Sequence, residues 1–204
     1  ILDNFEDEIQ PADYELQKDM MDRVSRVFSP ENYDRSQDFD LIKKNSQLIE
    51  KDSLRRLTEN IDLIYENYKS FDDKIQSISH KWLEEMNQGM QKYLTKKVES
   101  FEELDEYCYY VAGTVGGFLT ETIIYKFQIE GVNKNILLNN FNEAGLFLQK
   151  VNLIRDIKED LESRDKHFWP LKELGITEEE LVDPQNKDKA LNALSEMLND
   201  LISH

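Results

Sequence analysis

Apolar residues recur at helical spacing along almost the whole chain, and this spacing sets the fold class. The 204 residues include only seven glycines and four prolines, which favours long helices and few tight turns. No segment alternates apolar and polar residues as a strand would. We predict an all-α helical bundle with a loop over 29–38. The span 39–97 is expected to hold two or three helices, with breaks near 50 and 70. The other helices are expected over 1–8, from Pro11 to near Pro30, over 101–127, over 134–163, near 177–182 and from 188 onward.

Composition limits the partners of this chain. Hydrophobic residues make up 39% and charged residues 33%, a mixture that supports one folded domain of this length. The net charge of −17 repels phosphates, which argues against nucleic-acid binding and against electrostatic docking on anionic lipid. Any membrane contact would be peripheral and made by parts outside this chain. A single cysteine, Cys108, and no long apolar run predict a soluble chain, in the cytoplasm or at the cytoplasmic face of a membrane.

The most informative segment is residues 141–170, FNEAGLFLQKVNLIRDIKEDLESRDKHFWP. Asn152, Asp156 and Asp160 recur every fourth residue within an apolar helical pattern, so they share one helix face. Carboxylates in apolar surroundings cost several kcal/mol unless a cation or a metal pairs with them. A ladder of oxygen ligands suits Mg²⁺ with a diphosphate, and no His/Cys cluster suggests zinc.

A second acidic cluster, Asp3, Glu6 and Asp7, lies in ILDNFEDEIQ. Asp3 and Asp7 have the same i, i+4 spacing, and Glu6 sits one position off that face. Taken alone, the cluster is typical of a solvated helix face. Together, the two clusters indicate a metal site, because facing helices are where helical bundles build such sites.

The segment YCYYVAGTVGGFLTETI, residues 107–123, is rich in small residues. Gly113, Gly116 and Gly117 are costly in a helix interior, so they indicate either close helix packing or room for a long apolar ligand. A pocket with an apolar end and a carboxylate rim would suit a prenyl diphosphate. Before this helix, Ser100 and Glu103 resemble a capping box.

These segments resemble the signatures of the squalene/phytoene synthase family. The resemblance rests on YCYYVAGTVG, GLFLQKVNLIRDIKEDLESRDKHFWP and DNFED, with KWLEEMNQGM between them. LQK, KED and FWP look most like squalene synthases, and AGTVG resembles bacterial dehydrosqualene synthases. The resemblance predicts one domain over 1–204 with an isoprenoid-synthase-type bundle around a central prenyl pocket, lacking the family's N-terminal and C-terminal helices.

The family's activity implies head-to-head condensation of two farnesyl diphosphates through presqualene diphosphate, with Mg²⁺ as cofactor. Squalene synthases then reduce that intermediate with NADPH, whereas dehydrosqualene and phytoene synthases release it without reduction. The matching positions are Tyr107 and Arg155 as catalytic residues, Val111, Val115, Gly116, Gly145, Gln149 and Asn152 as substrate-binding residues, and Asp3, Asp7, Asp156 and Asp160 as metal ligands.

Other interpretations stay open at this point. A prenyl diphosphate phosphatase would need the same carboxylate ladder, and a non-catalytic helical homologue or fragment would keep only the fold. His80, His167 and His204 are expected to be non-catalytic, since no carboxylate partners them at a useful spacing, and Cys108 is expected to be a small buried residue. Arg164 and Lys166 fit either a mobile lid with a nucleotide contact or a solvated basic loop.

Overall fold

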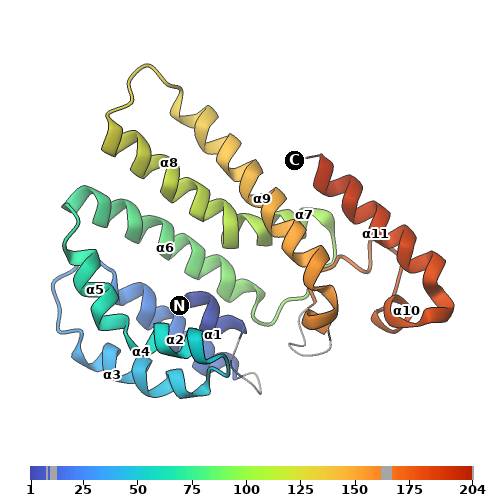
Figure 1. The fold of residues 1–204 in the computed structure, drawn as a ribbon, viewed down its shortest axis with the longest axis horizontal. Coiled ribbons are helices and arrows are strands. Elements are labelled where there is room, and N and C mark those ends of the chain that lie inside the picture. The colour runs from blue at the N-terminus through green and yellow to red at the C-terminus, as the bar shows by residue number, and fades with distance from the viewer. Residues whose placement is uncertain (8, 10–12, 162–166, 204) are drawn as a thin grey trace. The chain divides into compact units, whose positions relative to one another are not determined.

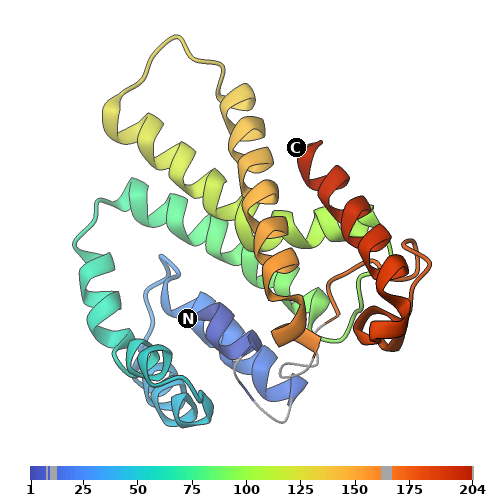
Figure 2. The same cartoon turned by 45° about the vertical axis from the view of Figure 1, so that its right-hand side comes forward.

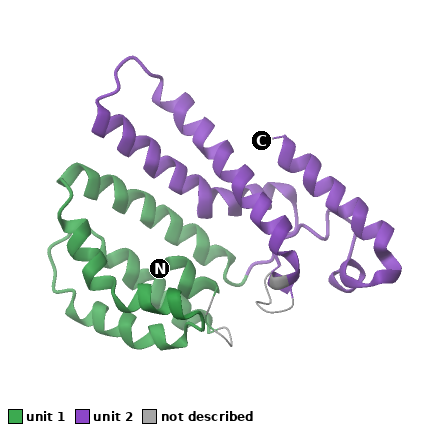
Figure 3. Ribbon diagram, viewed as in Figure 1, with its two compact units in different colours: residues 1–95 green, residues 96–204 purple. Residues whose placement is uncertain are grey.

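The computed structural model describes residues 1–7, 9, 13–161 and 167–203, without the side chain of Glu159. This part of the chain is helical, and its only β-type pairing is an isolated antiparallel bridge between Ile9 and Ile49. The predicted all-α class is confirmed. The chain forms two compact units, residues 1–95 and 96–204 (Figure 3). Whether the whole chain acts as the single domain expected from the sequence stays a prediction.

Residues 1–7, 9 and 13–95, the described part of the first unit, form six α-helices of very different length. They are α1 (Leu2–Asp7), α2 (Tyr14–Val27), α3 (Ser36–Asn45), α4 (Asp52–Glu59), α5 (Ile61–Lys69) and α6 (Asp73–Tyr93) (Figure 1). Two aspartates start helices here: Asp13 accepts from the Leu16 N–H on α2, and Asp72 accepts from the Ile75 N–H on α6. The core beneath these helices is fully buried at Phe5, Met21, Val27, Ile42, Ile49 and Ile61.

Two sequence predictions in this unit need correction. The span 39–97 holds parts of four α-helices instead of two or three, because the chain also breaks at Asn60, whose side chain binds the Arg56 carbonyl at 2.7 Å and ends α4. The loop predicted over 29–38 ends early, since α3 begins at Ser36. Arg35 orders the remaining loop by donating to the carbonyls of Val27, Ser29, Glu31 and Tyr33.

The second unit is built on a helical hairpin. Helix α7 (Phe101–Cys108) continues through a π-helical turn (Tyr109–Gly113) into α8 (Thr114–Phe127), which runs beside α9 (Lys134–Glu159), as Figures 1 and 2 both show. The chain leaves α8 at Gln128, which has a left-handed φ of 48°. Helices α10 (Glu178–Val182) and α11 (Lys187–Ile202) follow, with a 3-10 turn over Pro184–Asn186 between them.

Close helix approach explains the small residues of this hairpin. A Cβ at Gly116 would lie 2.7 Å from the Phe141 carbonyl oxygen, and one at Gly145 would lie 2.9 Å from the backbone of Ala112. Real Cβ atoms do not approach so closely, so these positions require glycine for packing. The close-packing interpretation of the glycine-rich segment is thus confirmed, and a ligand-lining role for the same positions stays a prediction.

The start of α7 confirms half of the predicted capping box. The Ser100 hydroxyl accepts from the Glu103 N–H, but the Glu103 carboxylate accepts from the Glu99 N–H at 2.8 Å instead of the Ser100 N–H. A full reciprocal box occurs at α10, between Thr177 and Glu180. The helices of the described ranges include none that is both long and apolar enough to cross a bilayer.

Candidate functional site

The ladder predicted on residues 152–160 lies on the C-terminal third of α9. Asn152 and Asp156 are partly exposed, whereas Asp160 is buried at 5% exposure. Asp160 follows the last residue of α9 and sits in a π-helical turn, and its N–H binds the carbonyls of Asp156 and Ile157. Such turns within α-helices are frequent at functional sites. The predicted helix to 163 therefore changes geometry at the last ladder position, and residues 162–166 lie outside the described residues.

Arg155 and Asp156 form a bidentate ion pair between neighbouring residues. The Nε and Nη2 atoms of Arg155 each lie 2.6 Å from an oxygen of the Asp156 carboxylate. The arginine side chain is 66% exposed and the aspartate side chain 28% exposed. The second rung of the ladder is therefore paired with a positive charge whose side chain is largely exposed.

The first acidic cluster belongs to the short helix α1 in the other unit. Asp3 is exposed, Asp7 is partly exposed, and Glu6 is buried at 1% exposure. The helix is held by the buried Phe5 and by Asn4, whose side chain donates to Thr58 at 3.0 Å. The burial of Glu6 distinguishes it from the two aspartates, as its offset from their face in the sequence indicates.

Each unit carries one pair of the aspartates that the sequence predicts as metal ligands. Across residues 1–7, 9, 13–161 and 167–203, no three His, Cys, Asp or Glu side chains converge closely enough to hold an ion. Mg²⁺ keeps several waters and commonly binds one or two carboxylates together with substrate phosphates. Asp3 with Asp7, and Asp156 with Asp160, each supply such a pair. That the two pairs serve one site stays a prediction.

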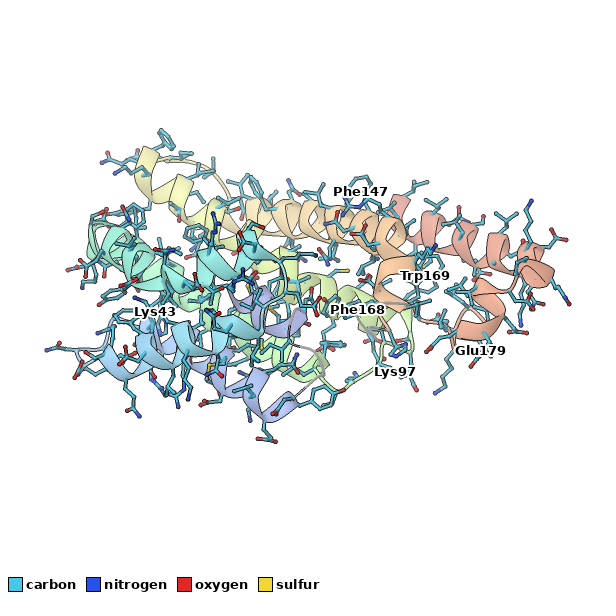
Figure 4. All side chains as sticks on the ribbon, turned by 60° about the horizontal axis from the view of Figure 1, so that its bottom comes forward. Lys43, Lys97, Phe147, Phe168, Trp169 and Glu179 are labelled. Atoms are coloured by element: carbon cyan, nitrogen blue, oxygen red, sulfur yellow. The ribbon has the colours of Figure 1, made fainter. Side chains whose placement is uncertain are left out.

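Tyr107 lies beneath an aromatic neighbour that the sequence did not single out. The tyrosine is buried at 3% exposure, and its ring stacks on Phe168 with centroids 4.3 Å apart and planes 18° apart. The adjacent Trp169 donates its indole N–H to the Leu153 carbonyl on α9 at 3.0 Å, and Figure 4 shows this side chain beside the C-terminal part of that helix. The FWP segment, residues 168–170, was the sequence feature that could have indicated this contact.

The remaining predicted substrate positions line the α8–α9 hairpin. Gly116 and Gly145 are buried at the contact between the two helices, and Gln149 and Val111 are partly exposed. Val115 is 43% exposed, and other large apolar side chains of the hairpin are exposed as well: Leu119, Phe147, Leu148 and Val151. The residues that could line an apolar tail therefore share one helical hairpin with the ladder.

The cysteine and the histidines behave differently from one another. Burial raises the pKa of the Cys108 thiol to about 12, so the thiol stays protonated at neutral pH, as expected of a buried structural residue. His80 lies 3.8 Å from Glu84. The expectation that no carboxylate partners a histidine is wrong for His167, whose Nδ1 lies 2.7 Å from Glu178, because folding joins residues eleven positions apart. His204, Arg164 and Lys166 lie outside the described residues.

Comparison with known proteins relates this chain to a protein family. The squalene/phytoene synthase family profile matches residues 1–204. An Arabidopsis thaliana protein named inactive squalene synthase 2 is 36% identical over 67% of this chain and 33% of its own length. The squalene synthase of Schizosaccharomyces pombe is 33% identical over 76% of this chain and 35% of its own length. The mouse (Mus musculus) enzyme is 33% identical over 76% of this chain and 37% of its own length.

Solved structures agree with the sequence comparison. TcSQS in complex with the ligand E5700 superposes with a TM-score of 0.71 and 27% identity, over 96% of this chain and 63% of that chain. Its complex with BPH1237 gives a TM-score of 0.69 at 26% identity, over 94% of this chain and 61% of that chain. The predicted fold class is confirmed, while the chain spans only about a third of the curated relatives' length. The chain belongs to the squalene/phytoene synthase family.

Proposed function

We propose that this protein is a Mg²⁺-dependent prenyltransferase that condenses two farnesyl diphosphates head to head, through presqualene diphosphate, and forms squalene with NADPH as the reductant. The observation that carries the proposal is the ladder of Asn152 and Asp156 on α9 and Asp160 in the π-helical turn that follows it, next to Arg155. Membership of the family supports the reaction class. The closer likeness of LQK, KED and FWP to squalene synthases supports the reduced product.

The physical task at this site is to separate charge away from water. When bound, Mg²⁺ neutralises the negative charge that develops on the departing pyrophosphate. Asp156 and Asp160 from α9, with Asp3 and Asp7 from α1, are the ligands that we assign to it. Arg155 adds a positive charge beside the ladder, where it stabilises the leaving group, and Asn152 and Gln149 bind diphosphate oxygens.

The apolar side of the α8–α9 hairpin determines whether the allylic cation reacts with a second substrate or with water. Val111, Val115, Gly116 and Gly145 are the positions that we assign to the prenyl tail. A tail that excludes water lets the alkene of a second substrate attack the cation, and loss of a proton from the resulting cation then closes the cyclopropane ring. We assign Tyr107 to the same region as a catalytic residue, because its phenol is held in an apolar setting under Phe168.

Three alternatives differ from this proposal in their products. A dehydrosqualene or phytoene synthase would release an unreduced hydrocarbon, and a prenyl diphosphate phosphatase would let water capture the cation. A non-catalytic homologue would form no product, and one relative at 36% identity is named as an inactive squalene synthase. Carboxylates at all four positions that match the family's metal ligands favour a catalytic protein.

Product analysis separates these alternatives. We would incubate the purified protein with farnesyl diphosphate and Mg²⁺, with and without NADPH, and identify the organic-soluble products. Squalene that appears only with NADPH supports the proposal. Dehydrosqualene under both conditions would overturn the reduction step, farnesol alone would overturn the condensation, and unchanged substrate would overturn both.

A further inference from the structure

Among the described side chains of residues 96–204, Lys150 on α9 is the most deeply buried charge. Its side chain has 0% exposure, and its Nζ lies 2.5 Å from Asp105 on α7 and 2.6 Å from Asp200 on α11. A buried ammonium without partners costs several kcal/mol, so the two carboxylates are needed for Lys150 to stay charged inside the fold. One side chain thus joins three helices by charge-assisted hydrogen bonds.

The position of Lys150 relates this triad to the ladder. Lys150 precedes Asn152 by two residues, and at about 100° per residue Asn152, Asp156 and Asp160 lie roughly 200°, 240° and 280° around the helix from it. Within α9, Lys150 therefore lies about 160° from Asn152 and about 120° from Asp156, and the triad contacts a side of the helix that the ladder does not use. Asp105 also lies two residues before Tyr107 on α7, so the same lysine connects the helix of the candidate catalytic tyrosine to the helix of the ladder.

We propose that Lys150 is a positioning residue that fixes the rotation of α9 against α7 and α11, and so sets the direction in which Asn152, Asp156 and Asp160 meet the metal. This proposal rests on the proposed function. An apolar side chain could fill the same volume but would allow the helix to turn. Residues that orient metal ligands from behind typically change metal affinity or activity by about 10- to 100-fold when they are removed.

The surroundings of the triad support a shared low-dielectric region. Cys108, one turn of α7 from Asp105, has a thiol pKa raised to about 12, chiefly by burial. Lys150 acts on this thiol in the opposite direction, while Asp105 and Asp200 raise its pKa further. All three charges of the triad thus act on the same buried thiol.

The test compares Lys150→Met with Lys172→Met. Lys172 is in the same unit and pairs with Glu99 at 2.7 Å, but its side chain is 74% exposed, so it controls for loss of a lysine charge. We would measure Mn²⁺ affinity by electron paramagnetic resonance without substrate, and the Mg²⁺ concentration that gives half-maximal turnover. Lys150→Met is expected to weaken both by at least about 10-fold, and Lys172→Met to change neither.

These readouts separate positioning from stability. A variant that is merely less folded binds the metal with an apparent dissociation constant equal to the intrinsic one divided by its folded fraction. We would therefore measure the folded fraction by circular dichroism and correct both values for it, so that a purely destabilised variant shows no remaining shift. Unchanged Mn²⁺ affinity and Mg²⁺ midpoint in Lys150→Met would therefore overturn the proposal. If that variant does not fold, Asp200→Asn takes its place, because it keeps the Lys150–Asp105 pair. It is expected to shift both values by several-fold, and no shift would overturn the proposal equally.

One further measurement keeps this proposal distinct from the proposed function. If the wild-type protein binds no Mn²⁺ and turns over no substrate, the proposed function fails. Hydrogen exchange then decides the role of Lys150. Faster exchange in Lys150→Met confined to the amides of residues 150–158 supports positioning, and an equal increase throughout residues 96–203 contradicts it.

Discussion

The two units hold their acidic motifs by different kinds of interaction. In the first unit, α1 has only six residues and depends on polar bonds from neighbouring helices, such as Asn4 to Thr58 and Gln17 to the Glu6 carbonyl at 2.7 Å. In the second unit, α9 has 26 residues and is held by close backbone contact at Gly145 and by Trp169. The same i, i+4 spacing is therefore presented by a short helix held by side-chain hydrogen bonds and by a long helix held by close packing and by the buried Lys150 triad.

The largest expected effect is on the Mg²⁺-dependent turnover to which the acidic motifs of both units are proposed to contribute. Asp156→Ala should lower Mg²⁺-dependent turnover of farnesyl diphosphate by at least about 100-fold. Helicity measured by circular dichroism should hardly change, because alanine favours a helix. Asp188→Ala, which removes an exposed acid from the first turn of α11, is the matched control. Normal turnover by Asp156→Ala would show that the ladder on α9 is not the metal site.

The first unit should be the more sensitive to acid, because a charged cluster joins α2 to α3. Asp38 accepts hydrogen bonds from Arg23, Arg26 and Tyr33. Burial by itself raises the pKa of the Asp38 carboxyl, but the hydrogen bonds from Arg26, Arg23 and Tyr33 outweigh burial and leave the pKa below its usual value.

Asp38→Asn should therefore lower the free energy of unfolding by about 1.5–3 kcal/mol at neutral pH. Because the folded-state pKa is depressed, the carboxylate contributes stability above its unfolded-state pKa and loses it as the pH falls through the folded-state value. Urea unfolding from pH 7 downward should show the gap between wild type and variant closing in acid. A gap that is constant with pH would mean that the carboxylate charge is not what stabilises this cluster.

The stability of the second unit should instead be sensitive to the volume of the side chains at its helix contacts. Gly145→Ala places a methyl group 2.9 Å from the backbone of Ala112, so α9 has to move away from the preceding helix. We expect a loss of about 1–3 kcal/mol in the free energy of unfolding, which is the usual effect of overpacking. The loss should be independent of pH between 7 and 4, in contrast to Asp38→Asn. A stabilised variant would mean that the hairpin has room at this position.

The smallest expected effect separates two tryptophans. Trp169→Phe removes the hydrogen bond to Leu153, whereas Trp82→Phe removes a buried indole N–H that has no partner among the described residues. Both substitutions delete the same atoms from buried sites, at 4% and 9% exposure. Trp169→Phe should be the more destabilising by about 1 kcal/mol in urea unfolding. Equal losses would show that the bond to α9 adds nothing beyond packing.

Local patterns predicted the helices well because apolar spacing and capping residues act over short distances. The helices at 101–127 and from 188 onward, and the short one near 177–182, were found within a few residues of α7 to α8, α11 and α10. The break at Asn60 was missed, since the apolar spacing continues across it and the cause is one side chain that binds its own helix end.

The candidate site was less accessible because its key contacts join distant residues. The ladder on α9 follows from i, i+4 spacing alone. In contrast, the stacking of Phe168 on Tyr107 and the pair of His167 with Glu178 depend on how the chain returns after α9. The burial of Lys150 could not be predicted either, because a lysine in an apolar segment is normally expected to face solvent. Its partners Asp105 and Asp200 are distant in the sequence and come close only in the folded chain.

The most direct test of the central claim is a crystal structure of the protein with Mg²⁺ and a non-ionisable thiodiphosphate analogue of farnesyl diphosphate. The account predicts that the ions on the diphosphate are bound by carboxylate oxygens of Asp3 and Asp7 from α1 and of Asp156 and Asp160 from α9. Ions bound by only one of the two motifs, or a diphosphate that lies away from both, would contradict it.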